Sequence, residues 1–396
     1  MKKESKASIL LGAAFLMATS AIGPGFLIQT THFTSILAAS FGFVILTSII
    51  IDIGAQMNVW RIIAVSEKRA QDIANAVLPG LGVFLAVLIV IGGLAFNIGN
   101  IAGAGLGLNV LFGVSPTMGA VLSGIVAILV FVVREAGKAM DRFTQVAGFV
   151  MIALTVYVMF TAQPPVGEAV VKTFVPDTID ILAIVTLVGG TVGGYITFAG
   201  AHRLLDAGIK GKESLGEVTR SSVSAIGIAS IMRIFLFLAS LGIVAQGLAI
   251  DPANPPASVF KLAAGNVGYK MFGIVLWSAA ITSVVGAAYT SVSFIRTLNP
   301  MFEKYSKWLT IGFISVSTVV FALVGKPVAI LILVGALNGL ILPISLGVIL
   351  IAAYKPKIVG DYKHPMWMTI FGVVIVLVMA AMSVYTLYTE IPKLFA

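Results

Sequence analysis

Apolar segments long enough to cross a bilayer recur along the whole chain, and they constrain its fold more than any other feature. A membrane-spanning helix needs about 20 mostly apolar residues. The chain offers eleven such segments, at residues 8–38, 43–65, 78–107, 116–133, 143–162, 179–203, 219–248, 271–296, 308–325, 328–352 and 366–389. We therefore expect an all-α integral membrane protein with about eleven transmembrane helices.

Composition supports this class. The 396 residues are 59% hydrophobic and only 10% charged, whereas soluble proteins carry about 25% charged residues. The chain has no cysteine, which excludes disulfides, thiol catalysis and thiolate metal sites. Loops long enough to fold separately are lacking, so residues 1–396 are expected to form a single transmembrane domain.

The basic residues indicate an orientation. With eleven spans, 19 Lys and Arg residues fall in the loops on one side and 5 on the other. Because basic residues concentrate in cytoplasmic loops, the N-terminus is expected in the cytoplasm and the C-terminus outside, in a bacterial inner membrane. The basic N-terminus followed by an apolar run resembles a signal peptide, but we interpret it as the first span. The net charge of +9 thus indicates a bilayer as partner and no nucleic acid.

Two spans contain helix-breaking residues. Span one reads S20-A-I-G-P-G-F26 and span six reads V188-G-G-T-V-G-G-Y195. Gly and Pro cost a helix about 1 and 3 kcal/mol relative to Ala, and lipid cannot bond the backbone groups that a break frees. Breaks at corresponding positions of two halves point to the binding site of a secondary transporter. A bound solute or ion would satisfy the freed groups.

From span one onward the chain resembles the Nramp family, which shares the LeuT-type fold of two inverted five-helix repeats with helices 1 and 6 broken. The resemblance implies repeats at about 8–162 and 179–352 and an extra helix at about 366–389. Family members carry L-G-P-G-F-L and then D-P-G-N in span one. Here L11-G-A-A-F-L16 is followed by G23-P-G-F26, so the metal-binding Asp falls on Gly23 and the Asn on Phe26.

Two further family motifs are also altered. The span-six motif G-A-T-V-M-P-H corresponds to G189-G-T-V-G-G-Y195, so that the family's Met falls on Gly193 and its His on Tyr195. The acidic D-L-A-E of span three corresponds to N97-I-G-N100, two neutral amides. The chain is therefore interpreted as a divergent branch without the metal-binding motifs.

These replacements suggest the cargo. Mn²⁺ and Fe²⁺ prefer carboxylate and imidazole donors, and stripping a divalent ion of water without a nearby negative charge is very costly. Smaller residues at Gly23 and Gly193 would enlarge the site beside Phe26 and Tyr195, unless these rings are ordinary core aromatics. We expect a small organic solute such as an amino acid or a compact carboxylate of proline or 5-oxoproline size. The alternative is a divalent metal ion (Mn²⁺, Fe²⁺ or Mg²⁺) at a relocated site.

The candidate substrate-binding residues lie at the two breaks and in span three. They are Gly23, Pro24, Gly25, Phe26, Gln29, Thr30, Asn97, Asn100, Gly189, Gly190, Gly193 and Tyr195. No residue is assigned as a metal ligand, and an enzyme or sensor is disfavoured because no catalytic constellation or attached soluble domain is found.

Ionisable groups within spans are functional candidates. Asp52 in span two and Arg233 in span seven lie at similar depths, and we expect an ion pair that acts as a structural lock, a gate or a proton relay. His32 and His202 flank the two breaks and are candidates for carrying a proton, or else hydrogen-bonded packing groups.

Span eight offers hydroxyl pairs for an ion. In sodium-coupled members of the fold, hydroxyls of span eight join carbonyls of span one around the ion. Thr282–Ser283 and Thr290–Ser291 are the candidates here, although membrane hydroxyls commonly bond the preceding helical turn. Na⁺ or H⁺ is thus a possible coupling ion, and no other cofactor is expected. The glycine run G103-A-G-L-G-L108 is interpreted as close helix packing.

Overall fold

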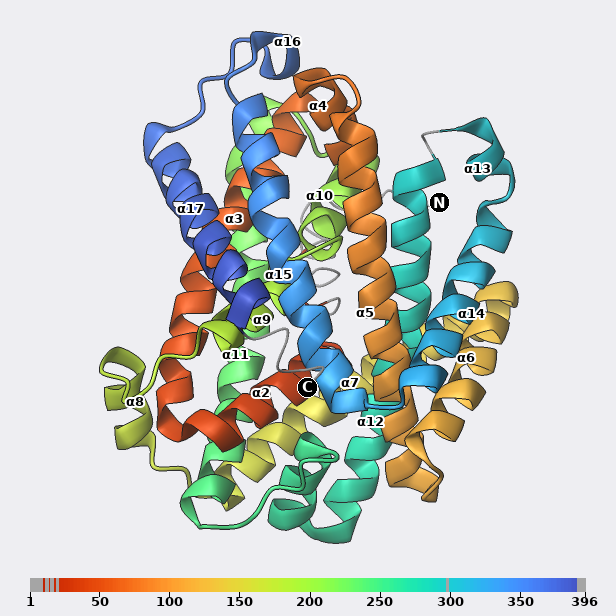
Figure 1. The fold of residues 1–396 in the computed structure, drawn as a ribbon, viewed down its shortest axis with the longest axis vertical. Coiled ribbons are helices and arrows are strands. Elements are labelled where there is room, and N and C mark those ends of the chain that lie inside the picture. The colour runs from red at the N-terminus through yellow and green to blue at the C-terminus, as the bar shows by residue number, and fades with distance from the viewer. Residues whose placement is uncertain (1–9, 11–13, 15–17, 19–20, 297–298, 390–396) are drawn as a thin grey trace.

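The computed structural model describes residues 10, 14, 18, 21–296 and 299–389, and these residues fold into helices joined by short loops (Figure 1). The first half of predicted span one lies almost entirely outside the described residues. The long helices are α2 (Pro24–Leu37), α3 (Phe41–Ser66), α5 (Leu81–Phe112), α6 (Pro116–Val132), α7 (Arg134–Thr161), α9 (Ile181–Val192), α10 (Ile196–Asp206), α11 (Leu215–Ala245), α12 (Pro255–Arg296), α14 (Ser306–Val324), α15 (Pro327–Ala352) and α17 (Met366–Thr389).

Short helices connect the long ones near the ends of the bundle. They are η1 (Ala38–Ser40), α4 (Ala70–Val77), α8 (Val166–Phe174), η2 (Lys212–Ser214), α13 (Pro300–Lys304) and α16 (Pro356–Val359).

The predicted all-α membrane class is confirmed, but the number of eleven spans is not. Within the described residues, eight helical stretches are long and apolar enough to cross a membrane, or nine if a pair bent by 102° counts as one span. The difference has local causes. The stretch Pro24–Ser66 counts once although η1 divides it, and Pro116–Val132 has only 17 residues.

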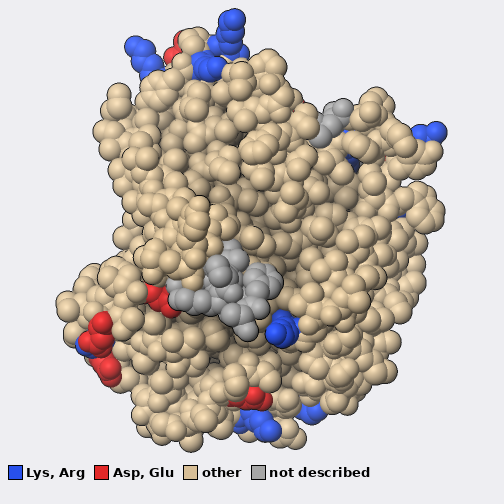
Figure 2. Space-filling model, viewed as in Figure 1, with Lys and Arg blue, Asp and Glu red and all other residues tan. Residues whose placement is uncertain are grey.

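Three of the basic segments that were predicted to share one side of the membrane, those that adjoin or contain α4, α13 and α16, lie towards the same end of the bundle. Helices α4, α13 and α16 occupy the upper end of the bundle in Figure 1, and α8 lies towards the other end. Ion pairs link the chain at the upper end: Lys210 pairs with Glu67, and Lys212 pairs with Asp361. In the upper middle of the face in Figure 2, no Lys, Arg, Asp or Glu is seen, as expected for a surface that contacts lipid. Which end faces the cytoplasm stays a prediction.

Glycines of α5 let neighbouring helices approach closely. A β-carbon added at Gly103 would lie 2.1 Å from Cβ of Pro24 on α2, and one at Gly107 would lie 2.8 Å from Cβ of Trp277 on α12. Added at Gly105, it would lie 2.2 Å from the backbone oxygen of Pro116. The interpretation of this glycine run as a packing surface agrees with these contacts.

Candidate functional site

The first break lies where span one was predicted to be interrupted. Ile22 and Gly23 are non-helical, and α2 begins at Pro24. Gly23 is extended, with φ −107° and ψ −171°, and no side chain caps the helix. Because the first N–H groups of a helix have no partner within it, the start of α2 presents the backbone donors of Gly25 and Phe26.

The second break separates α9 from α10. Helix α9 ends at Val192, Gly193 is extended, and Gly194 has a φ of +55° before α10 begins at Ile196. That positive φ favours glycine, since a β-carbon is poorly tolerated in this region. Both predicted breaks are therefore present.

The breaks face a common cavity at the start of α2. Its volume is about 10 Å³, which is space for about one water molecule. It is lined by Ala21, Gly23, Gly25, Phe26, Gln29, Phe96, Asn100, Gly190, Tyr195, Leu331 and Val334. Seven of these residues were predicted site residues, and they come from both breaks and from α5.

The polar groups of the cavity are neutral. Gln29 donates from Nε2 to the backbone oxygen of Leu331 at 2.9 Å, while its Oε1 is buried without a hydrogen-bond partner. Asn100 lies opposite the first break: its Oδ1 would be 3.7 Å from a β-carbon at Gly23. The ring of Tyr195 packs edge-on against Phe96 at 5.7 Å between centroids. The cavity thus offers amide, phenol and backbone groups in an apolar frame.

Other predicted site residues lie outside the cavity lining. Pro24 packs against Gly103, and Gly189 lies against α15, where an added β-carbon would be 1.9 Å from the backbone oxygen of Gly335. Thr30 donates its hydroxyl to the backbone oxygen of Phe26 at 2.7 Å, one turn earlier in its own helix. These positions support the walls of the site.

Gly193 does not enlarge the site, contrary to our expectation. A β-carbon there would lie 2.4 Å from the backbone oxygen of Gly189 and 2.7 Å from that of Asn338. The missing side chain allows α15 to pack against the break and leaves no extra space for cargo.

Asn97 also points away from the cavity. Its Nδ2 donates to Ser317 Oγ of α14 at 3.1 Å, and its Oδ1 is buried without a partner. Asn100, one turn further along α5, faces the cavity.

Four residues that line the cavity were not predicted from the sequence. Phe96 precedes Asn100 by one helical turn, so the i, i+4 spacing could have identified it. Leu331 and Val334 share a face of α15, and Ala21 precedes the first break. Nothing in these three apolar residues distinguishes them from ordinary core positions.

Asp52 and Arg233 are close but do not form the predicted direct ion pair, since no N–O distance of 4.0 Å or less joins them in the described chain. Thr191 lies between them: Arg233 Nη1 donates to Thr191 Oγ1 at 3.1 Å, and the Asp52 carboxylate lies near the same hydroxyl. The Thr191 hydroxyl itself donates to the backbone oxygen of Leu187 at 2.8 Å. Both charges are buried, with 1% of Asp52 and 3% of Arg233 exposed. The guanidinium lies over the ring of Phe26, 4.3 Å from its centroid, and so reaches the edge of the cavity.

Of the hydroxyl candidates in α12, Ser283 is the one next to a break. Its Oγ would lie 3.6 Å from a β-carbon at Gly23. Thr282 instead bonds the backbone oxygens of Ser278 and Ala279, at 3.2 and 3.1 Å.

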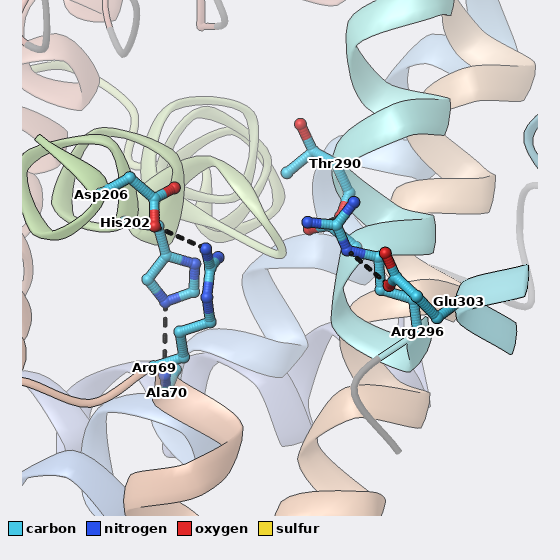
Figure 3. Close-up of polar contacts among 8 residues, drawn as sticks. Arg69, Ala70, His202, Asp206, Thr290, Arg296 and Glu303 are labelled. Carbon is cyan, nitrogen blue, oxygen red and sulfur yellow. Dashed lines mark hydrogen bonds and ion pairs between the residues drawn. The ribbon is translucent and has the colours of Figure 1, made fainter. Parts of the chain in front are cut away.

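The other predicted pair lies further along α12. Ser291 is buried against Gly93 of α5 without a partner for its hydroxyl. Thr290 lies near the end of the helix, beside the Arg296–Glu303 ion pair (Figure 3). The two predicted pairs therefore do not converge on one site.

The two histidines occupy different surroundings. His202 accepts a hydrogen bond at Nε2 from the backbone N–H of Ala70 at 3.3 Å, and its ring stacks on Phe198. Beside it, Arg69 pairs with Asp206 at 2.6 Å, which ties the start of α4 to the end of α10 (Figure 3). His32 is half-buried on α2. In the described part of the chain, no three His, Asp or Glu side chains are placed to hold a metal ion.

Two broken helices that meet at one cavity within an apolar bundle define a LeuT-type membrane transporter. Solved structures agree: the fold matches a manganese transporter of Eremococcus coleocola with a TM-score of 0.75, at 14% identity over 99% of this chain and 90% of that one. MhsT in complex with L-phenylalanine matches with a TM-score of 0.62, at 17% identity over 95% and 97% of the two chains.

The profile of the family described as natural resistance-associated macrophage protein-like (Nramp) matches residues 14–389. The chain therefore belongs to the Nramp family. It is 70% identical to the uncharacterized membrane protein YcsG of Bacillus subtilis, over 100% of this chain and 98% of that protein. It is 62% identical to an uncharacterized membrane protein of Haemophilus influenzae, with 98% of both covered. A divalent metal cation transporter MntH of Vibrio campbellii is 22% identical, over 75% of this chain and 71% of that protein.

Proposed function

We propose that this Nramp transporter belongs to a branch without the family's metal site, and that it carries a small organic solute by alternating access. The class of cargo is an amino acid or a compact carboxylate of proline or 5-oxoproline size. One observation carries the proposal: the cavity at the two breaks is lined by neutral groups only. Without a carboxylate, imidazole or thioether ligand, a divalent cation would lose its hydration shell and gain no ligand that compensates for this cost.

The backbone at the first break supports an anionic or zwitterionic cargo. Helix α2 starts in the cavity wall with no side-chain cap, so its first N–H groups have no partner within the helix or from a capping side chain. Helix N-termini carry a partial positive charge and bind carboxylates and phosphates. The carboxylate of the cargo would accept from the N–H groups of Gly25 and Phe26, and its apolar part would pack on the rings of Phe26, Phe96 and Tyr195.

The small size of the cavity implies that a conformational change must precede the binding of an organic solute. At about 10 Å³ it holds one water-sized group, so an organic solute enters only when the lining helices move apart, and α2 and α10 are the helices we expect to move. Both helices start at non-helical residues, Gly23 for α2 and Gly193–Tyr195 for α10. Such residues at the ends of elements are the places where a hinge absorbs a dihedral change. The same two breaks would therefore serve as site and hinge.

The second candidate cargo is a divalent metal ion, and the comparisons support it better than they support an organic solute. Relatives at 22% and 25% identity are named divalent metal cation transporters, and the E. coleocola structure is of a manganese transporter. Such an ion would need neutral oxygens, namely Gln29 Oε1, Asn100 Oδ1 and carbonyls freed at the end of α9. The water-sized cavity would suit a single ion.

For a coupling ion, Ser283 is our preferred ligand among the α12 hydroxyls because it lies beside Gly23. Na⁺ bound there would share the carbonyls that the first break frees. H⁺ remains the alternative coupling ion, and we infer no further cofactor.

Binding to purified protein separates the two cargo classes. A ligand that binds the folded state raises the unfolding temperature in proportion to the logarithm of its concentration over Kd. We expect stabilisation by proline or 5-oxoproline and none by Mn²⁺, Fe²⁺ or Mg²⁺ at equal concentrations. Stabilisation by Mn²⁺ alone, followed by Mn²⁺ uptake into proteoliposomes, would establish the second candidate instead.

A further inference from the structure

A buried guanidinium lies next to the cavity with part of its hydrogen-bonding capacity unused. Arg233, in the middle of α11, is 3% exposed. Its Nη1 bonds Thr191, while Nε and Nη2 have no hydrogen-bond partner. These two nitrogens form one edge of the guanidinium plane, the edge that binds a carboxylate through two parallel hydrogen bonds.

Asp52 does not fill this role. Its Oδ1 is itself buried without a partner, and its interaction with Arg233 is longer than an ion-pair contact. The two charges therefore neutralise each other across Thr191 without sharing hydrogen bonds. Burying charged groups with unmet donors and acceptors is costly, so this cluster is better suited to receive a ligand than to stabilise the fold.

Phe26 separates the guanidinium from the cavity. Its ring lies 4.3 Å below the guanidinium carbon, and the same residue lines the cavity. Phe26 is also the third residue of α2, directly after the break. Because Phe26 belongs to α2, a movement of α2 would also move this ring relative to Arg233.

We propose that Arg233 binds the carboxylate of the cargo when Phe26 moves aside, which makes this a transporter of organic anions or zwitterions. The inference rests on the proposed organic cargo and narrows it to molecules with a carboxylate. Arg233 is thus a binding residue, and Asp52 is its counter-ion while the site is closed.

The test compares two ligands that differ only in the carboxylate. 5-Oxoproline carries one, and 2-pyrrolidinone is the same ring without it. Binding to the purified full-length protein is measured by calorimetry or thermal shift. We expect the wild type to bind 5-oxoproline at least about tenfold more tightly than 2-pyrrolidinone, because a bidentate carboxylate contact is lost with the lactam. Equal affinities would overturn the inference.

Variants at the pair identify the partner of the carboxylate. Arg233→Lys keeps the charge but loses the two-nitrogen edge, so we expect 5-oxoproline to bind at least about tenfold more weakly and 2-pyrrolidinone to be unaffected. Asp52→Asn removes the competing negative charge and is expected to tighten 5-oxoproline binding. Unchanged 5-oxoproline affinity in Arg233→Lys would refute the role of Arg233, as would weaker binding in Asp52→Asn. If a variant fails to fold, the wild-type comparison still decides.

The outcomes also distinguish this inference from the proposed function. If both ring compounds bind alike and are transported, the organic cargo stands and the role of Arg233 falls. If neither they nor proline bind and Mn²⁺ does, the organic cargo itself is wrong, and the inference falls with it.

Discussion

Gly23 and Ser283 face each other across the first break: a β-carbon at Gly23 would lie 3.6 Å from the Ser283 hydroxyl, an ordinary contact distance. Gly23 is extended, a conformation that any residue adopts. The absence of a side chain there is therefore not required by the backbone or by packing. We infer that the absence of a side chain at Gly23 leaves space in the cavity.

Gly23→Ala should fold with a stability within about 1 kcal/mol of the wild type, yet reduce cargo uptake about tenfold or more, because one misplaced methyl group in a tight site costs that much. Uptake into proteoliposomes and the unfolding temperature are the two measurements. Gly286→Ala, in the same helix as Ser283 with nothing within 4 Å of the new β-carbon, is the matched control. Wild-type uptake by Gly23→Ala would place the cargo elsewhere.

Gly193 should behave in the opposite way. Its new β-carbon would meet two backbone oxygens, those of Gly189 and Asn338, and backbone cannot rotate away as a side chain can. We expect Gly193→Ala to lower stability by about 1–3 kcal/mol and Gly193→Met to give little folded protein. Thermal unfolding in detergent, again beside Gly286→Ala, tests this. A wild-type unfolding temperature for Gly193→Ala would show that α15 can move away from the break.

The contrast between these two glycines shows how far sequence reasoning reached. Both breaks could be predicted from the sequence, because Gly and Pro change the backbone conformation at their own positions. Which glycine opens space and which allows a neighbouring helix to pack closely depends on α15, which begins more than 130 residues after Gly193 in the chain. The same limit explains why Asp52 and Arg233 were predicted to form a direct ion pair. Their similar depths in the membrane indicated that they lie close together, but the sequence could not show that Thr191 lies between them. The apolar wall formed by Leu331 and Val334 carries no local signal at all.

The absence of cysteine makes the predicted orientation directly testable. Lys357→Cys in α16 and Glu168→Cys in α8 place single thiols at opposite ends of the bundle (Figure 1). Since basic loops stay in the cytoplasm, a membrane-impermeant maleimide applied to intact cells should label Glu168→Cys alone. Lys357→Cys should react only after the membrane is permeabilised. The reverse labelling pattern would invert the topology.

A histidine outside the spans predicts how stability depends on pH. His364, between α16 and α17, hydrogen-bonds Asn58 Oδ1 through Nε2 at 2.7 Å and the Tyr362 hydroxyl through Nδ1 at 3.1 Å. Burial, aided by repulsion from Arg61, lowers the pKa of His364 from 6.5 to about 4. The folded state therefore holds this ring neutral at pH values where the unfolded chain binds a proton.

The contribution of His364 to the free energy of unfolding should therefore be fully present above about pH 6.5 and decline as the pH falls towards 4, because protonation favours the unfolded chain. The unfolding temperature measured between pH 7.5 and 4.5 tests this. His364→Gln retains a donor for Asn58 but cannot titrate, so its unfolding temperature should fall less over the same range. Identical pH profiles for the two proteins would mean that His364 is not what couples stability to pH, and that other groups control the acid limb.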